Sequence, residues 1–244
     1  MSHIILTGAT GLVGSAVLQH ALSSPSISKV SILSRRPVAA ADGNPKANVI
    51  IHKDFTSYPP ELLHQLSGAS ACIWAQGISS VGMKEDEYTI ITKTYPLAAA
   101  EAFKGIPVKG KFNFVYVSGS GADQNGKASQ MFGRVKGDAE KQLLGIASSR
   151  PTFSVYNLRP AAIDPGKTWI AERKQSFFEK AFFSGAAPLL RPFMSSMFIT
   201  TEKLAEVSVA LALGDGEKVT GKGIDPDGYT IENIGIPGSE VNPG

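Results

Sequence analysis

The chain has little cysteine and no strong excess of charge, and both scarcities narrow the class of protein. Cys72 is the only cysteine in 244 residues, so no disulfide can form within the chain, as is typical of a reducing compartment. The net charge is +3 and no run of five like charges occurs, so we expect no nucleic acid partner. The four histidines lack metal-ligand spacing, and we expect no metal site.

Long apolar runs and hydrolase signatures are also missing. No uninterrupted apolar stretch approaches the length of a membrane span, and no basic-then-apolar leader precedes the first expected strand. These features predict a cytoplasmic protein, with mitochondrial or membrane-peripheral association as the alternative. No Gly-x-Ser-x-Gly elbow occurs, because Ser118-Gly119-Ser120-Gly121 ends an expected strand without a helix directly after it.

What the sequence does contain is a regular alternation of β-rich runs and helical patterns, which predicts an α/β fold with a doubly wound parallel sheet of the Rossmann type. Several runs are apolar on consecutive residues, as expected for strands covered on both faces. The expected strands are Ile4–Leu6, Val30–Ser34, Val49–His52, Ala71–Ala75, Phe112–Ser118 and Phe153–Leu158. The expected helices cover residues 11–23, 60–67, 85–104, 130–147 and 201–213.

The segment Thr7-Gly-Ala-Thr-Gly-Leu-Val-Gly14 connects the first expected strand to the first expected helix. Glycines with this spacing allow a tight turn at Gly8, a close backbone approach to a pyrophosphate at Gly11, and helix–sheet packing at Gly14. The helix N-terminus adds free N–H groups and a positive dipole end. We therefore predict a dinucleotide site here that also includes Thr10, Leu12 and Val13.

The end of the second expected strand indicates which nicotinamide cofactor binds. Ser34, Arg35 and Arg36 stand there, and no acid occurs between Gly14 and Asp42. An acid at this point would bind ribose hydroxyls and repel a 2′-phosphate, whereas arginine binds that phosphate. The pattern favours NADP(H) over NAD(H); the alternative is that both arginines are merely solvated.

Two further segments are expected near the cofactor. Asp54 could accept a hydrogen bond from the adenine amino group while Phe55 flanks the ring, or Asp54 could cap a turn. After the fourth strand, Ala75-Gln76-Gly77 offers small residues where the cofactor would cross the sheet, or forms an ordinary turn.

Four motifs in order along residues 3–213 resemble the atypical and extended short-chain dehydrogenase/reductases, and more narrowly the small Tat-interacting-protein-type branch with its fungal mitochondrial relatives. The motifs are residues 7–14, Val-Ser-Gly-Ser-Gly-Ala-Asp at 117–123, Phe-Gly-Arg-Val-Lys-Gly-Asp-Ala-Glu at 132–140, and Leu-Arg-Pro at 158–160. The resemblance implies a dinucleotide site that also includes Lys136, Pro160 and Ala161.

The family's chemistry rests on Ser or Thr, Tyr and Lys, with the last two spaced Tyr-x-x-x-Lys on one helix face. The resemblance thus makes Ser118 and Lys136 the catalytic residues, with Lys136 also holding the ribose. Position 132 is phenylalanine, which cannot donate a proton. Losing a positioned general acid costs roughly 10²–10⁴-fold in rate. Tyr88, Tyr95 and Tyr116 are better explained as packing residues than as replacement acids.

Residues 1–160 are expected to form the nucleotide-binding sheet, and residues 161–244 a small region covering the carboxyl edge of the strands. Aromatic and other large apolar residues crowd into 166–200, and Lys174, Lys180 and Arg191 interleave with them. This segment could wall a pocket for an apolar substrate, pack on the sheet or form a homodimer face, or contact a membrane surface.

Two functions follow from these observations. The leading prediction is an NADPH-dependent oxidoreductase that reduces a small apolar carbonyl or enone, despite Phe132. The alternative is a non-catalytic NADP(H)-sensing regulator or scaffold that resembles NmrA-like proteins. Phe132 favours the regulator, whereas Ser118, Lys136 and the complete glycine loop favour the enzyme.

Overall fold

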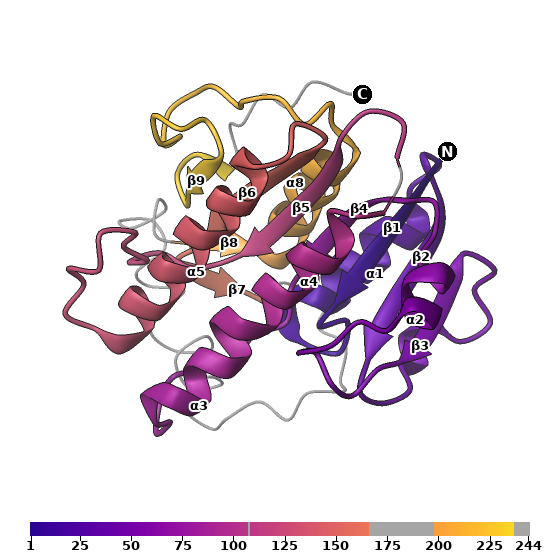
Figure 1. Cartoon of the computed structure of the whole chain (residues 1–244), viewed down its shortest axis with the longest axis horizontal. Helices are drawn as coiled ribbons and strands as arrows, with labels where there is room; N and C mark the ends of the chain where they lie inside the picture. The colour runs from indigo at the N-terminus through magenta and orange to yellow at the C-terminus, as the bar shows by residue number, and fades with distance from the viewer. Residues whose placement is uncertain (107, 166–197, 237–244) are drawn as a thin grey trace.

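The core of the molecule is one parallel sheet, seen in a computed structural model that describes residues 1–106, 108–165 and 198–236 (Figure 1). The strands lie in the order β3-β2-β1-β4-β5-β6-β9, and every pairing between them is parallel. Their bounds are β1 (Ser2–Thr7), β2 (Ile27–Ser34), β3 (Ala47–Ile51), β4 (Ala69–Trp74), β5 (Phe112–Val117), β6 (Phe153–Arg159) and β9 (Thr230–Glu232). The strand order reverses between β1 and β4, so the carboxyl ends of these two strands define the crevice where ligands of such sheets bind.

Helices cover both faces of the sheet. On one face α1 (Leu12–Ser23) packs against α8 (Thr201–Leu213), and α8 also contacts β4 and β5. On the other face lie α2 (Pro60–Gln65), α4 (Tyr95–Phe103) and α5 (Met131–Ser148), with α4 against α5. Strands covered in this way can be apolar on consecutive residues, and Ile4, Ile5 and Leu6 of β1 are all completely buried.

The elements that the sequence predicts are present, with one helix divided. The region 85–104 forms α3 (Glu85–Thr89), a π-helical turn η2 (Ile90–Thr94) and then α4. Within η2 the backbone carbonyl of Thr92 accepts a hydrogen bond from the Tyr116 phenol at 2.9 Å. A π-helical turn inserts an extra residue into the helix, and helical periodicity in the sequence does not reveal it.

The described part of the region after residue 160 adds a helix to one face of the sheet and a strand to its edge, while residues 166–197, on which the expected cover of the carboxyl edge mainly rests, lie outside the described residues. Its helix α8 has the predicted bounds but lies on a face of the sheet, and β9 extends the sheet beside β6. Two further short strands, β7 (Ala162–Asp164) and β8 (Phe198–Thr200), pair with each other. Strands of three residues are too short to show an alternating pattern, so no sequence pattern predicts them.

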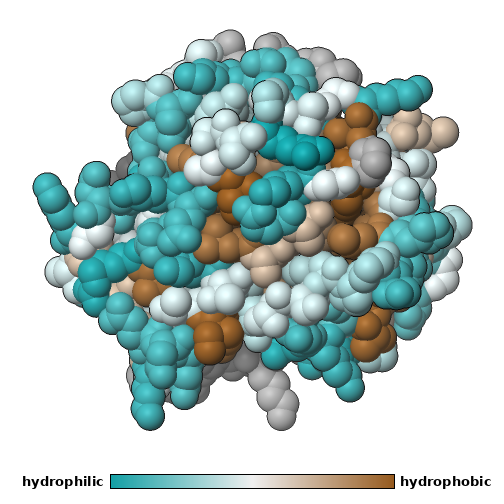
Figure 2. Space-filling view, viewed as in Figure 1, coloured by the Kyte–Doolittle hydropathy of each residue, from teal (hydrophilic) through white to brown (hydrophobic). Residues whose placement is uncertain are grey.

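The outer surface is mainly hydrophilic on the face that carries α4 and α5, with small apolar patches between polar side chains (Figure 2). Among the described residues, no helix combines the length and apolarity that a membrane crossing needs. The aromatic segment singled out in the sequence lies mostly outside the described residues, which omit 166–197.

Candidate cofactor and active site

The glycine loop after β1 is held closely against the end of β4. Gly8 has a φ of +72°, which side-chain-bearing residues rarely adopt, and a Cβ there would meet the carbonyl oxygen of Ala75. A Cβ at Gly14 would meet the carbonyl oxygen of Gly8 in the same way. Both positions therefore require glycine: Gly8 for the tight turn and its contact with the end of β4, and Gly14 for the close packing of α1 against the loop.

The N-terminus of α1 opens at this loop. Gly11 is its N-cap, and no side chain caps the first turn, which begins with Leu12 and Val13. The Gly11 N–H donates to the Gly8 carbonyl at 2.8 Å, which holds the loop in a compact form. Uncapped N–H groups and the positive end of the helix dipole suit a bound phosphate.

A cavity of about 570 Å³ extends from the glycine loop along the carboxyl ends of β1, β2 and β4. Ten of the residues expected to bind the cofactor line it, together with Ala9 and Leu33, which the sequence analysis did not single out. The ten are Gly8, Thr10, Gly11, Ser34, Arg35, Arg36, Phe55, Ala75, Gln76 and Gly77. Ala9 belongs to the glycine loop and Leu33 to the end of β2. Each is a direct neighbour of a predicted residue along the chain, and this adjacency could have indicated that they line the cavity.

Arg35 and Arg36 stand at the outer end of this cavity, directly after β2. Both side chains are exposed, and the Arg36 N–H donates to the Ser34 hydroxyl at 3.3 Å. Two cations beside the rim favour an anionic group at this end of a bound molecule.

Asp54 and Phe55, expected to contact the adenine together, differ in their surroundings. Phe55 is almost completely buried yet lines the cavity, with its ring 5.9 Å from the Trp74 ring. The exposed Asp54 carboxylate accepts hydrogen bonds from the Thr56 N–H and hydroxyl at 2.9 and 2.5 Å. These bonds lower the pKa of Asp54, and they correspond to the turn cap, the alternative given for this residue.

Ser118 and Lys136 meet at the carboxyl end of β5. The Lys136 ammonium donates to the backbone carbonyl of Ser118 at 2.5 Å, and burial lowers the pKa of Lys136 to about 8 although Glu140 opposes this shift. The buried Ser118 hydroxyl has no hydrogen-bond partner in the part of the chain that the structure describes. A buried hydroxyl without a partner is costly, so it suits an acceptor atom supplied by a ligand.

Phe132, which stands where the sequence resemblance leads us to expect a tyrosine, lies one turn before Lys136 on α5. Its ring faces the loop after β5, since a Cβ at Gly121 would lie 3.6 Å from two ring carbons. Lys136 faces the same loop at Gly119. The Phe132 ring and Lys136 therefore face the same loop, which follows Ser118, and the ring lacks the phenol oxygen.

The remaining predicted residues lie near these groups. Pro160 follows β6, and its carbonyl accepts a hydrogen bond from the Ser120 N–H at 2.8 Å, so it adjoins the Ser118 loop. The Ala161 N–H donates to the Asn233 side chain at 2.8 Å. Neither Pro160 nor Ala161 lines the cavity at the glycine loop.

Tyr116, considered as a replacement for the missing phenol, is 2 % exposed and donates to the Thr92 carbonyl. Burial raises the pKa of Tyr116 far above its ordinary value. Tyr88 is equally buried, and Tyr95 packs with its ring 5.8 Å from Phe55. All three are packing residues, as the sequence predicts.

A buried ionic network, which no motif in the sequence predicts, surrounds Arg159 at the end of β6. Arg159 at the end of β6 donates to both oxygens of Glu140 on α5, the shortest bond being 2.6 Å, and to Glu232 of β9 at 2.7 Å. Gln124 donates to Glu140 at 3.1 Å. Glu140 is completely buried and lies one turn after Lys136, so this network fixes the helix that carries Lys136.

The sheet, its switch point and the glycine loop define a Rossmann-type nucleotide-binding protein. No protein-family model matches the chain. It is 33% identical over 257 residues to the leucinostatins biosynthesis cluster protein T of Purpureocillium lilacinum, with 96% of this chain and 93% of that protein covered. It is 27% identical over 223 residues to the mitochondrial protein fmp52 of Aspergillus niger, covering 89% of this chain and 88% of the relative.

The chain belongs to the same protein family as the leucinostatins biosynthesis cluster protein T. Its motifs at residues 7–14, 117–123, 132–140 and 158–160 are those by which it resembles the atypical short-chain dehydrogenase/reductases. Solved structures share the fold. A short-chain dehydrogenase/reductase from Saccharomyces cerevisiae has a TM-score of 0.64 at 15% identity, with 96% of each chain covered. The Bordetella bronchiseptica enzyme WbmF, in complex with NAD+, also has a TM-score of 0.64, at 12% identity, covering 97% of this chain and 76% of WbmF.

Proposed function

We propose that the protein is an NADPH-dependent oxidoreductase that reduces an apolar carbonyl or enone. The observation that carries the proposal is the pairing of two features at one edge of the sheet. One is the glycine-loop cavity that ends at Arg35 and Arg36. The other is Ser118, whose backbone carbonyl accepts a hydrogen bond from Lys136 and whose hydroxyl has no partner among the described residues.

The cavity suits an extended dinucleotide. The pyrophosphate would lie at the loop from Gly8 to Gly11 and the N-terminus of α1, and the 2′-phosphate at Arg35 and Arg36. Phe55 would lie against the adenine. WbmF and MoeE5, which share the fold, are known in complex with NAD, which supports a nicotinamide dinucleotide; the two arginines support the phosphorylated form.

Bound NADPH would supply the hydride. The Ser118 hydroxyl would donate a hydrogen bond to the substrate carbonyl oxygen, stabilising the negative charge that develops there. The Lys136 ammonium would hold the nicotinamide ribose while it keeps its bond to the Ser118 carbonyl. Because Phe132 has no proton to give, a water molecule or a group of the substrate would protonate the oxygen.

The names of the relatives support a substrate from small-molecule biosynthesis. Two belong to fungal biosynthesis clusters, for leucinostatins and for botcinic acid. Other relatives are named mitochondrial, which supports the mitochondrial alternative over the cytoplasmic one. A homodimer and contact with a membrane surface stay secondary proposals.

The test is NADPH consumption, followed by absorbance at the nicotinamide band with a panel of apolar ketones, enones and quinones. Substrate-dependent consumption that Ser118→Ala reduces by about 10²-fold or more is expected, because this change removes a donor to the developing oxyanion. The control is Ser120→Ala, an exposed serine two residues away, which leaves the rate unchanged. Equal rates for wild type and Ser118→Ala would contradict the proposed role.

The second candidate is a regulator or scaffold for which NADP(H) is a ligand that sets the conformation, and Phe132 is the observation that favours it. In that case no compound consumes NADPH, and a partner protein is retained on the immobilised chain only when the nucleotide is present. Consumption with any substrate class, sensitive to Ser118→Ala, would decide against this candidate.

A further inference from the structure

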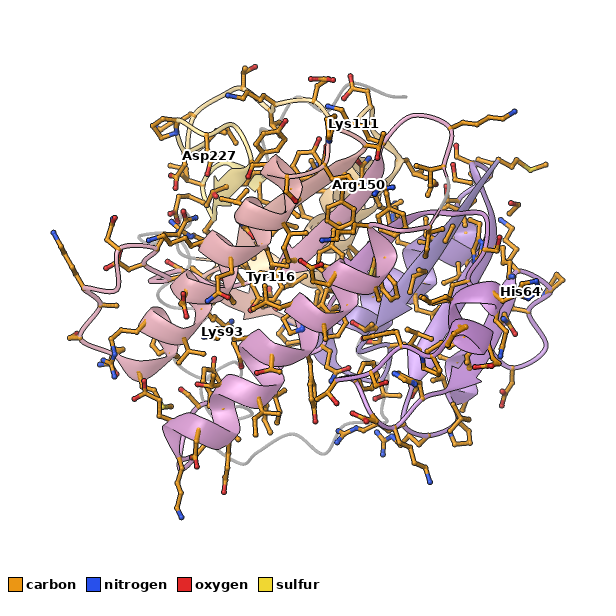
Figure 3. All side chains as sticks on the ribbon, in the orientation of Figure 1. His64, Lys93, Lys111, Tyr116, Arg150 and Asp227 are labelled. Carbon is orange, nitrogen blue, oxygen red and sulfur yellow. The ribbon has the colours of Figure 1, made fainter. Side chains whose placement is uncertain are left out.

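A second cavity, of about 370 Å³, lies at the opposite end of the sheet from the cofactor site. It is formed where β5, β6 and β9 begin, beside the C-terminal turns of α5. Lys111, Arg150 and Asp227, which line it, gather at one end of the molecule in Figure 3, away from Lys93. This location separates it from the glycine loop and from Ser118, which stand at the carboxyl ends of the strands.

Most of the cavity wall is apolar. Phe153 and Val155 of β6 form its buried base, and Leu144 and Ala147 of α5 form one side. The ring of Tyr229 adds to the wall. A concave apolar wall with a few charged groups is the ordinary composition of a small-molecule site.

The charged groups of this cavity are mostly cationic. Lys111, Arg150 and Lys218 line it, and Asp227 is the acid among the described lining residues. Asp227 already accepts hydrogen bonds from the Tyr229 N–H at 2.6 Å and from the Thr230 N–H and hydroxyl at 2.8 and 2.9 Å. Its oxygens therefore serve to hold the start of β9.

Two of the three cations have no acidic partner among the described residues. Lys111 pairs with Glu217 at 2.8 Å, which neutralises it. No ion pair to a described acid is found for Arg150 or Lys218. After these pairings, the cavity presents apolar surface next to two uncompensated positive charges.

The loops that carry the charges are held in place. The Ser154 hydroxyl donates to the Gly216 carbonyl at 2.7 Å and the Tyr156 hydroxyl to the Glu217 carbonyl at 2.6 Å, both in the loop before Lys218. A Cβ at Gly228 would lie 2.7 Å from the Cβ of Lys218, so the start of this lysine is closely packed. The cavity is thus a formed site whose walls need little ordering when a ligand binds.

From this arrangement we propose that the cavity binds an amphiphilic carboxylate, an apolar chain or ring that bears one carboxylate group. The apolar part fills the space over Phe153 and Val155, and the carboxylate lies between Arg150 and Lys218. A neutral ligand of the same size would leave the two charges unused, and a cationic one would be repelled. The site is independent of the cofactor, so it can exist whether or not the chain reduces anything.

Calorimetric titration with three ligands of equal chain length tests the proposal: octanoate, octanol and octylammonium. We expect saturable binding of one octanoate, about tenfold tighter than octanol, since each partly exposed ion pair adds a modest amount to the affinity. Octylammonium should not bind. Equal affinity for octanoate and octanol, or no saturable binding of octanoate, would overturn the proposal.

Variants then assign the binding to this cavity. The double change Arg150→Glu and Lys218→Glu should weaken octanoate about tenfold or more, and Ala147→Trp should abolish binding by filling the space. The matched control is Arg35→Glu with Arg36→Glu, which reverses the same charge at the cofactor site and should leave octanoate binding unchanged. Thermal unfolding of each variant verifies folding. Octanoate binding that survives the first pair and disappears with the second would place the ligand at the cofactor site and refute the inference.

Discussion

The ammonium of Lys136 lies 2.5 Å from the backbone carbonyl oxygen of Ser118. The contact joins α5 to the carboxyl end of β5, so the lysine is held in place by the backbone before any ligand arrives. The same side chain is partly withdrawn from water, which makes its charge sensitive to mild alkali. Measurements of cofactor binding against pH can therefore test both the position of the Lys136 ammonium and its lowered pKa.

The pH dependence of cofactor binding should report on Lys136. Its pKa is lowered to about 8, so the charged form predominates below pH 8 and is lost above it. If the ammonium holds the ribose, NADPH affinity should be constant from pH 6 to 7.5 and then fall by up to about tenfold per pH unit above 8. Fluorescence titration measures this. Lys136→Arg, which stays charged, should give a flat profile, and a wild-type profile that is flat to pH 10 would contradict the role.

The two arginines after β2 should determine nucleotide choice. We expect NADPH to bind about tenfold or more tightly than NADH, because Arg35 and Arg36 pair with the 2′-phosphate. Replacing both with alanine should remove most of that preference and leave NADH affinity nearly unchanged. Lys109→Ala with Lys222→Ala, two exposed lysines, is the control for net charge. Equal affinity of the wild type for both nucleotides would refute the assignment.

Phe132 provides a gain-of-function test. Because its ring already faces the loop that carries Ser118, Phe132→Tyr should place a phenol beside Lys136 and raise NADPH-dependent turnover by about 10-fold or more. Lys136→Ala should weaken cofactor binding, whereas Lys141→Ala, an exposed lysine on the same helix, should not. If Phe132→Tyr leaves turnover undetectable across a broad carbonyl panel, the lost phenol is not the reason for inactivity.

The close packing of α1 against the glycine loop can be tested with two glycine-to-alanine substitutions, one in α1 and one in α5. A Cβ at Gly14 would collide with the Gly8 carbonyl, so Gly14→Ala should lower the free energy of unfolding by about 2 kcal/mol or more and abolish nucleotide binding. Gly145→Ala in α5 meets nothing within 4 Å and should stabilise the protein by about 0.5–1 kcal/mol. Chemical denaturation compares them. A stable, nucleotide-binding Gly14→Ala protein would refute the close contact.

The buried network should matter far more than the ion pairs at the surface. Glu140→Gln leaves the Arg159 charge buried with only Glu232 and the more distant Asp225, so we expect a loss of about 3 kcal/mol in the free energy of unfolding. Lys203→Gln, which breaks an exposed pair with Glu206, should cost less than about 0.5 kcal/mol. Similar small losses for both would mean that the network does not hold α5.

The sequence predicts the sheet well because its signals are local. Apolar runs locate the six longer strands, and the spacing of apolar residues locates α5 within one residue of its observed ends. The glycine spacing leads to Gly8 and Gly14, and the structure shows why both positions require glycine. These features depend on residues that are near one another along the chain.

What the sequence could not provide depends on contacts between distant segments. Arg159 is visible in a motif, but its partners Glu140 and Glu232 come from two other elements. For Asp54 the sequence is compatible with both a ligand contact and a turn cap, and the hydrogen bonds from Thr56 that form the cap depend on the local backbone conformation. The second cavity combines residues from four separate segments and has no sequence motif.

The position of β9 in the sheet has a consequence for how the chain folds. β6 ends at residue 159, but its outer neighbour begins only at residue 230. While the intervening segment is being synthesised, β6 is an unpaired edge strand with open backbone groups, and Arg159 lacks Glu232. Such an edge readily pairs with another chain. The interval between the emergence of β6 and the docking of β9 is therefore when a nascent chain is most exposed to aggregation and has most need of a chaperone.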